Sequence, residues 1–176
     1  STTDNPGHGD CIINNSEPND WRSPKNDDLW QGVGGTNNPC PGGYRLPTDA
    51  EWDAERLTWS SNNAAGAFAS PFKLPVAGYR DFSDGSLSYV GSYGFYWSST
   101  IDGSNSRILG FGSSNVGMYS YYRARGLSVR CLKDSGTPAT VPTVTTFNVT
   151  SITESTASCT GNVTDSGGAS VTARGV

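Results

Sequence analysis

The chain is 176 residues long, 34% of its residues are hydrophobic, and its formal net charge at pH 7 is −4. This length predicts one domain with a small second module, and the low hydrophobic fraction, with 22 glycines and 10 prolines, predicts a modest core and many loops. The acidic balance argues against nucleic acid as a partner, and no apolar run is long enough for membrane insertion.

One helix is predicted in the first part of the chain. Thr48-Asp-Ala-Glu51 forms a capping box directly after Pro47, and the helix is expected to continue to about Trp59. The remainder of this part is expected to form short strands, in one of which Phe95 and Trp97 alternate into the core. The expected strands cover residues 73–76, 95–99, 107–111 and 127–132, and in the last of them Leu127, Val129 and Cys131 share an inward face. One helix followed by such strands predicts the α+β class.

Residues 103–133 contain no Asp or Glu, although the chain is acidic overall. They are rich in Ser, Asn, Gly, Tyr and Arg, which dominate antibody paratopes because Tyr and Arg give large contacts for little lost rotamer freedom. An ordinary polar segment crossing an antiparallel sheet explains the same composition. We take ten residues as candidate ligand contacts and expect the three tyrosines among them to be replaceable without unfolding: Arg107, Ser113, Ser114, Asn115, Tyr119, Ser120, Tyr121, Tyr122, Arg123 and Arg125.

The composition changes near Asp134, after which Phe147 is the one aromatic residue. Residues 135–142 predict a linker between a domain at residues 1–134 and a β module at residues 143–176. Residues 157–164 and 169–173 alternate between small apolar and polar types, as half-buried strands do. An immunoglobulin-like sandwich needs about seven strands, so either the chain is a piece of a longer one or another polypeptide completes the fold.

Residues that could support catalysis or bind metal are scarce. His8 is the only histidine and lies among Gly and Asp near the first residue, so a catalytic unit with a histidine base would depend on it alone. The four cysteines lack the close spacing of zinc sites and redox motifs. We therefore expect no enzyme activity, no metal and no cofactor.

Four blocks of the chain resemble a known family. They are Asn38-Pro-Cys-Pro-Gly-Gly-Tyr-Arg-Leu-Pro-Thr-Asp-Ala-Glu-Trp52 and residues 74–80, 91–100 and 126–134, and they resemble the Fibrobacter succinogenes major paralogous (FISUMP) domain. The resemblance implies a C-type-lectin-like fold for residues 1–134 and an exported or surface protein of Bacteroidetes-type bacteria or their phages. The family's biochemical function is mostly unassigned. Residues 161–176 resemble the opening of immunoglobulin-like repeats from the same bacteria.

Residues 105–125 also resemble, in composition and position, the variable stretch of C-type-lectin-like proteins that are diversified by retroelements. They lie just before the expected closing strand at Val129-Arg-Cys131. Diversification of this segment is a hypothesis that sequencing the locus across a growing population tests, because codons that never vary would contradict it.

The lectin-like fold also hosts enzymes that act through a cysteine pair, which makes Cys40 and Cys131 worth weighing. Cys40 stands between two prolines and Cys131 faces inward on its expected strand, so a structural disulfide between them is the preferred interpretation. The pairing of Cys11 and Cys159 stays open.

These expectations together describe an extracellular protein of a cell or virion surface. It binds a glycan or protein receptor without catalysis, for adhesion or recognition, and Arg123 and Arg125 supply charge-assisted hydrogen bonds to an acidic ligand. The alternative is a structural subunit of an extracellular fibre, or filament, in which copies of the chain complete the partial β module by strand addition.

Overall fold

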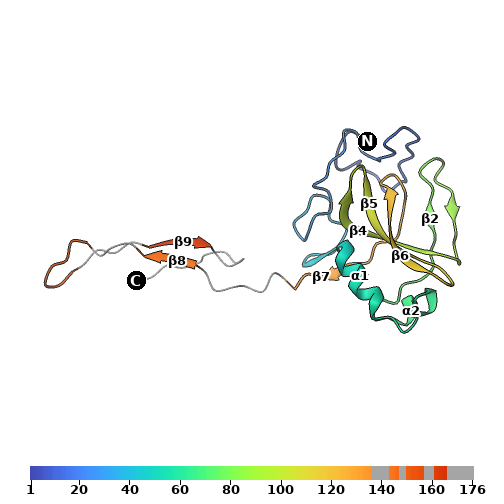
Figure 1. Cartoon of the computed structure of the whole chain (residues 1–176). Helices are drawn as coiled ribbons and strands as arrows, with labels where there is room; N and C mark the ends of the chain where they lie inside the picture. Colours follow the sequence, from blue (N-terminus) through green and yellow to red (C-terminus); the bar gives the residue numbers. More distant parts are fainter. Residues whose placement is uncertain (136–142, 147–149, 157–160, 166–176) are drawn as a thin grey trace. The chain divides into compact units, whose positions relative to one another are not determined.

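The computed structural model describes residues 1–135, 143–146, 150–156 and 161–165. The chain divides into two compact units, Ser1–Asp134 and Ser135–Val176. Figure 1 labels helices and strands of both units. The division falls where the aromatic residues become scarce.

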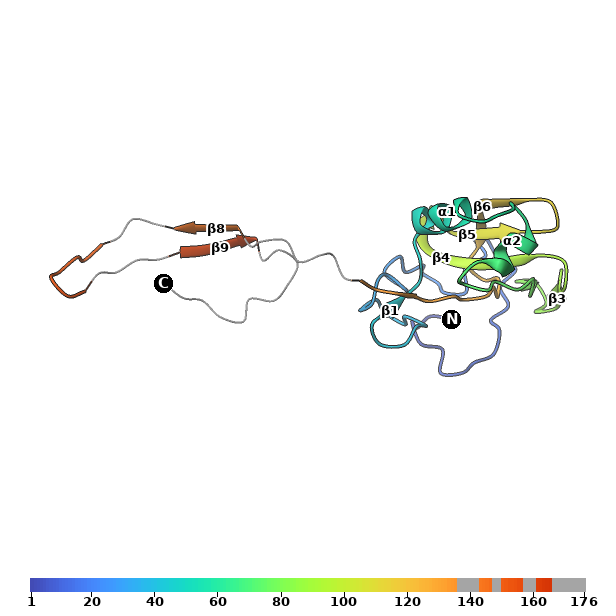
Figure 2. The same cartoon turned by 90° about the horizontal axis from the view of Figure 1, so that it is seen from below.

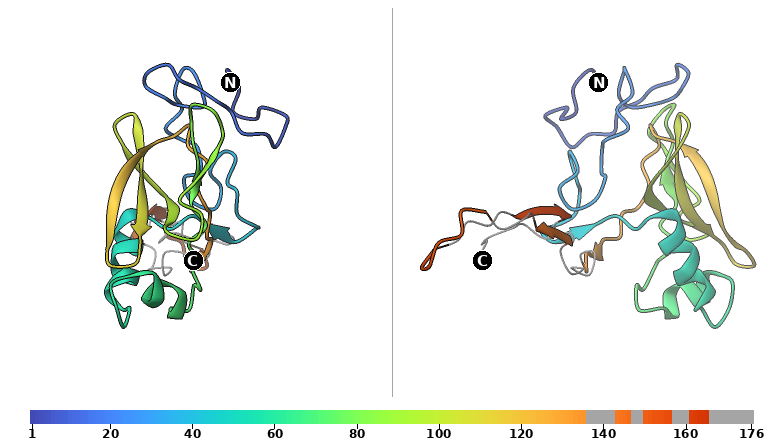
Figure 3. Two further views of the ribbon diagram at one scale, coloured as in Figure 1. Left: turned by 90° about the vertical axis from the view of Figure 1, so that its right-hand side faces the viewer. Right: turned by 60° about the vertical axis from the view of Figure 1, so that its left-hand side comes forward.

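A three-stranded antiparallel sheet forms the centre of the first unit. Its strands are β4 (Gly94–Asp102), β5 (Asn105–Phe111) and β6 (Val116–Tyr122), in the order β4-β5-β6. A two-residue turn joins β4 to β5, and its Gly103 has φ 61°, a left-handed conformation that such turns require and that glycine adopts without strain. The three strands lie side by side in Figures 1 and 3.

Two short helices accompany this sheet. Helix α1 (Asp49–Leu57) begins at the predicted capping box, in which the Thr48 hydroxyl accepts from the Glu51 amide at 3.2 Å while the Glu51 carboxylate accepts from the Thr48 amide at 2.8 Å. It ends two residues before the predicted end and contacts all three strands (Figure 2). Helix α2 (Ala64–Ala69), capped by Asn63, was not predicted because its six residues, five of them Ala or Gly, show no amphipathic period.

Two further sheets contain only two short strands each. Strand β1 (Tyr44–Arg45) pairs with β7 (Leu132–Lys133), and β2 (Tyr79–Arg80) pairs with β3 (Leu87–Ser88), both antiparallel.

Two of the expected strands are corrected by the structure. Residues 73–76 form no strand, since Lys73 has φ 51° and Pro75 offers no amide hydrogen. Of residues 127–132 only Leu132 lies in a strand. Ser128 instead makes an isolated parallel bridge to Tyr96, and Val129 is exposed rather than inward.

The predicted α+β, C-type-lectin-like class is therefore wrong for this chain. The described residues form small antiparallel sheets with only two helices, of nine and six residues, which makes the fold β-rich. The capping box begins a helix of fewer than three turns. The glycines and prolines around it favour turns, so the neighbouring chain forms loops and short strand pairs.

The second unit contains a single two-stranded antiparallel sheet among its described residues. Strand β8 (Thr143–Thr146) pairs with β9 (Gly161–Asp165). The partial immunoglobulin-like module expected at residues 143–176 stays a prediction. Part of the strand expected at 157–164 lies in β9, whereas residues 157–160, with Cys159, and residues 169–173 lie outside the described residues.

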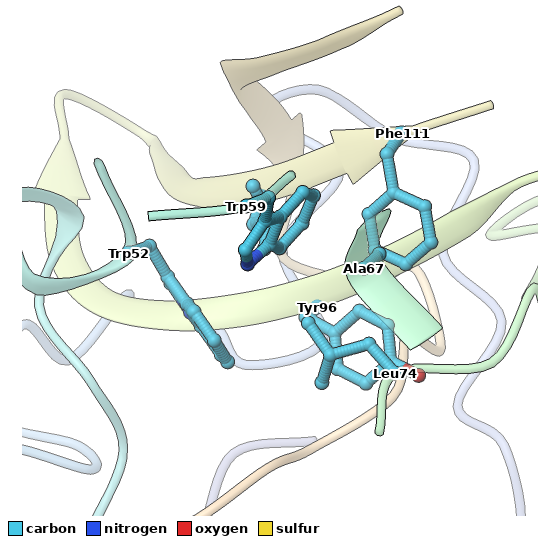
Figure 4. Packing of buried hydrophobic residues seen from close by; sticks show 7 residues of the cluster. Trp52, Trp59, Ala67, Leu74, Tyr96 and Phe111 are labelled. Carbon is cyan, nitrogen blue, oxygen red and sulfur yellow. The ribbon is translucent and has the colours of Figure 1, made fainter. Parts of the chain in front are cut away.

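The first unit has two core clusters. One, with Phe95, Trp97 and Ile108, lies on the face of the sheet opposite the helices, and the larger lies between the central sheet and the two helices. Trp52 is fully buried and its indole donates to the Trp97 carbonyl at 3.1 Å, which ties α1 to β4. Tyr96 stacks on Phe111 at 5.9 Å between ring centroids (Figure 4). The larger cluster comprises Trp52, Trp59, Ala67, Leu74, Tyr96, Leu109 and Phe111.

A disulfide joins Cys40 to Cys131, the pair that the sequence analysis named. It links the loop before β1 to the residue that precedes β7, and these two strands pair with each other. Beside it, the Arg45 guanidinium donates to Glu51 at 2.7 Å and to Asp134 at 2.9 Å. Cys11 is exposed and has no disulfide partner among the described residues.

Candidate functional site

The hairpin of β5 and β6 places its side chains alternately on the two faces of the central sheet. Met118 packs against the core beneath α1, and Arg107 and Ser120 lie on that same face. Tyr119 and Tyr121 lie on the opposite face, because side chains alternate along a strand. The sheet thus separates the candidate residues into two groups.

Tyrosines from several segments gather on the face opposite α1 and surround a cavity of about 420 Å³, which we name the tyrosine groove. Tyr79 lies 5.3 Å from Phe95, and Tyr89 lies 5.4 Å from Tyr93, between ring centroids and close to edge-to-face. Such contacts hold the rings in fixed orientations. The groove is lined by Tyr79, Tyr89, Tyr93, Phe95, Gly110, Phe111, Asn115, Tyr119, Tyr121 and Arg125.

Tyr119 lies along the backbone of two glycines that face each other in the sheet. Gly110 on β5 pairs with Gly117 on β6, and a Cβ at either position would come within 3.0 Å of the Tyr119 side chain. The absence of side chains at this pair creates the shelf on which the ring rests. The residue is nevertheless 43% exposed, so this aromatic side chain is positioned by the sheet and still presented to solvent.

Arg125 is held in the groove by aromatic rings. Its guanidinium carbon lies 4.6 Å from the centroid of Tyr121, 4.7 Å from that of Tyr79 and 5.5 Å from that of Phe82. Its Nε is buried and has no hydrogen-bond partner among the described residues. The pKa of Asp81 is lowered mainly by hydrogen bonds from Ser83, with a smaller effect of the Arg125 charge. The cation is therefore stabilised by ring faces.

Two other predicted ligand arginines make internal ion pairs. The Arg107 Nε lies 2.8 Å from Asp49 of α1, and its guanidinium also donates to Ser120 at 3.1 Å. The Arg123 side chain is only 9% exposed and lies 3.4 Å from Asp20 and 2.8 Å from Asp27. Hydrogen bonds from Lys25 and Arg123 lower the pKa of Asp27. Arg107 and Arg123 thus hold α1 and the N-terminal segment in place.

The remaining predicted contacts fall in three places. Ser113 and Ser114 are exposed at the tip of the β5–β6 hairpin, and Asn115 beside them lines the groove. The Ser120 hydroxyl bonds Asp102 and Arg107 on the other face. The ring of Tyr122 lies 5.2 Å from that of Phe82, edge to face. Of the ten predicted residues, the structure brings four to the groove: Asn115, Tyr119, Tyr121 and Arg125.

Sequence reasoning missed Tyr79, Tyr89 and Tyr93, which lie before β4 in the chain. The segment 77–93 closes on itself directly before β4, because the Gly78 amide donates to the Tyr93 carbonyl at 2.8 Å. Tyr89 has φ 59°, an uncommon conformation for an aromatic residue, and it is 55% exposed. The one available signal was the density of tyrosine between residues 79 and 96.

A larger cavity of about 560 Å³ lies between the N-terminal segment and the sheet. Trp21, Trp30 and Trp97 line it together with Asp4, Asp27 and several amides. Asp4 pairs with Arg22, and Asp27 pairs with Lys25 and Arg123. Arg125 borders this cavity as well as the tyrosine groove. We place the candidate site in the tyrosine groove because, among the described residues, no Asp or Glu lines it, whereas Asp4, Asp10 and Asp27 line the larger cavity.

Within the described residues, no group of three or more His, Cys, Asp or Glu side chains is placed to hold a metal ion. In that same part of the chain no helix is long and apolar enough to cross a membrane.

The comparisons with known proteins add one similarity. A family model described as a domain of unknown function (DUF8237) matches residues 58–132. No curated protein and no solved structure matches the chain. The matched segment contains every residue that lines the tyrosine groove and leaves out α1. The resemblance to the FISUMP domain stays a prediction.

Proposed function

We propose that the first unit binds a glycan or protein receptor at the tyrosine groove, without catalysis, as part of an extracellular surface protein. The observation that carries this proposal is Tyr119, which rests on the Gly110–Gly117 pair and remains 43% exposed. Phe95 on the same face is buried, whereas the ring of Tyr119 is both fixed by the sheet and accessible to a ligand. The Cys40–Cys131 disulfide supports an oxidising, extracellular setting.

The construction of the groove suits binding with little loss of entropy. Its rings already restrain one another, so few rotamers remain to be fixed when a ligand arrives. Tyrosine combines an apolar ring with a hydroxyl that donates and accepts hydrogen bonds. Sugars and protein loops both offer apolar and hydroxyl or amide groups to such a surface.

The test uses the full chain, a glycan array and a panel of cell surfaces. Tyr119→Ala is expected to weaken binding at least tenfold while the thermal unfolding midpoint changes little. Tyr44→Ala is the matched control, because Tyr44 is an exposed tyrosine on β1 that does not line the groove. Unchanged binding by the Tyr119 variant would refute the proposal.

Substitution of Tyr119, Tyr121 and Tyr122 together, which the sequence alone recommended, is less informative. Tyr121 is half-buried and its ring lies 5.5 Å from that of Phe95. If the triple variant failed to bind, the lost packing of Tyr121 could be the cause, and loss of binding could not be distinguished from loss of folding.

The second candidate function is assembly into an extracellular fibre. The observation that favours it is the two-stranded sheet of β8 and β9, since such a sheet is marginally stable by itself and gains from a further strand. A neighbouring copy can supply that strand by edge pairing. Light scattering and electron microscopy of the native protein test this function. Ordered polymers are expected, and monodisperse monomers at high concentration would contradict it.

A further inference from the structure

Arg125 differs from the other unpaired arginines of the first unit, Arg80 and Arg130, because it is half-buried whereas they are exposed. Among the described residues, five arginines pair with carboxylates of the same chain: Arg22, Arg45, Arg56, Arg107 and Arg123. Arg125 has no ion pair in that part of the structure, although it is half-buried and lines a cavity. Among the described residues, no Asp or Glu lines the groove.

We propose that the tyrosine groove binds a hexuronic acid unit of an acidic polysaccharide, with its carboxylate on Arg125 and its sugar ring on Tyr119. This inference rests on the proposed function of the groove. The guanidinium lies against the rings of Tyr79 and Tyr121, so its stem and face are fixed by aromatic contacts. A guanidinium held in this way offers its N–H edge to a planar carboxylate, which it matches with two parallel hydrogen bonds.

The other walls of the groove match the remainder of a sugar ring. Five tyrosines line it, so aromatic faces and hydroxyls alternate around a space of about 420 Å³. Aromatic faces suit the apolar C–H surface of a pyranose, and tyrosine hydroxyls can donate to or accept from its hydroxyl groups. The volume falls within the usual range of small-ligand sites, about 300–1,000 Å³.

The same contacts exclude a cationic ligand. Aromatic cages attract cations, but here the positions over Tyr79, Tyr121 and Phe82 are already taken by Arg125. A second cation would meet the positive charge of Arg125, and among the described residues no Asp or Glu lines the groove. An anion gains from the same arrangement, and its binding weakens as salt screens the pair.

The first experiment compares two forms of one probe on the unaltered full chain. Oligogalacturonate carries a free carboxylate on each ring, and its methyl ester keeps the ring but removes the charge. We expect the free acid to bind at least tenfold more tightly than the ester in isothermal titration calorimetry. This comparison does not depend on whether a variant folds. Equal affinities for the two forms would overturn the inference.

The second experiment varies the protein. Arg125→Gln is expected to lose at least tenfold in affinity for oligogalacturonate. Arg125→Lys keeps the charge but not the planar guanidinium, so its loss of affinity should be smaller. Arg130→Gln is the matched control, because Arg130 is exposed, belongs to the same basic stretch and does not line the groove. An Arg125→Gln variant that is folded and binds normally would overturn the inference.

The remaining outcomes separate this inference from the proposed function. Displacement of oligogalacturonate by an equal concentration of poly-glutamate carboxylates would overturn it, since the groove would then recognise acidic peptides. Binding of a receptor that depends on Tyr119 but not on a hexuronate would overturn it and leave the proposed function intact. A chain that binds no probe, array glycan or cell surface would overturn both.

Discussion

The two faces of the β4–β5–β6 sheet carry alternate side chains of the same three strands, but they lie in different environments. On the face toward α1, Trp52, Leu109 and Phe111 are buried and close a dry core. On the other face, Phe95 and Ile108 are equally buried, but outside them lies a layer of tyrosines with Arg125 among them. The comparison shows that one sheet can bury a packed core on one side and line an aromatic groove on the other, where we propose binding.

The strongest test of this division is the deletion of a core side chain on the α1 face. Trp52→Ala removes a fully buried indole and its hydrogen bond to the Trp97 carbonyl. We expect the free energy of unfolding to fall by about 3–5 kcal/mol, the range typical of such deletions. Tyr119→Ala on the other face should cost less than about 1.5 kcal/mol because Tyr119 is partly exposed. Equal losses in urea denaturation would refute the division.

Removal of the disulfide tests how much this bond contributes to the stability of the first unit. Cys40 and Cys131 are separated by 91 residues in the sequence. Replacing both with Ser should lower the free energy of unfolding by about 2–4 kcal/mol, since the bond restricts the unfolded chain. Denaturant unfolding of the oxidised chain and of the double variant measures the difference. A difference below about 1 kcal/mol would show that the Arg45 ion pairs hold β1 and β7 together without it.

The glycine shelf under Tyr119 gives a more selective test. An alanine in a strand is usually more stable than a glycine by about 0.5–1 kcal/mol. Gly117→Ala should instead destabilise by about 1 kcal/mol and weaken ligand binding, because its Cβ would meet Tyr119 at 3.0 Å.

The double variant of Gly117→Ala with Tyr119→Ala checks the cause. With the ring absent, the same glycine substitution should become neutral or stabilising, which a double-mutant cycle measures. An unchanged cost in the Tyr119→Ala background would place the strain elsewhere.

The smallest expected effect concerns pH at the start of α1. Hydrogen bonds from Arg45 lower the pKa of Glu51 to about 2, against an ordinary value of 4.5. Because the folded value is the lower one, this carboxylate stabilises the fold above pH 4.5, and the contribution disappears as the pH falls from 4.5 toward 2. We expect about 1 kcal/mol, reduced by screening because the side chain is 35% exposed.

The Glu51→Gln variant isolates this effect. Its unfolding midpoint should depend less on pH between 4.5 and 2 than that of the unaltered chain. Equal slopes in that window would contradict the assignment to Glu51.

Local patterns made part of this structure predictable. The capping box of Thr48 and Glu51 places the start of α1, and the alternation of Phe95 and Trp97 places both in the core. These features depend on hydrogen bonds and side-chain directions within a few residues. The fold class was predicted wrongly because such patterns do not state how much of the chain stays in loops and strand pairs of two residues.

The amino-acid sequence shows that there is a basic, tyrosine-rich segment, but it does not show which residues of that segment meet in a groove. Arg123 and Arg125 stand two residues apart and are chemically the same. In the tertiary structure Arg123 forms ion pairs with Asp20 and Asp27. Arg125 is surrounded by the rings of Tyr79, Phe82 and Tyr121. The difference arises because these partners are distant in the chain, and a charge takes its properties from the groups packed around it.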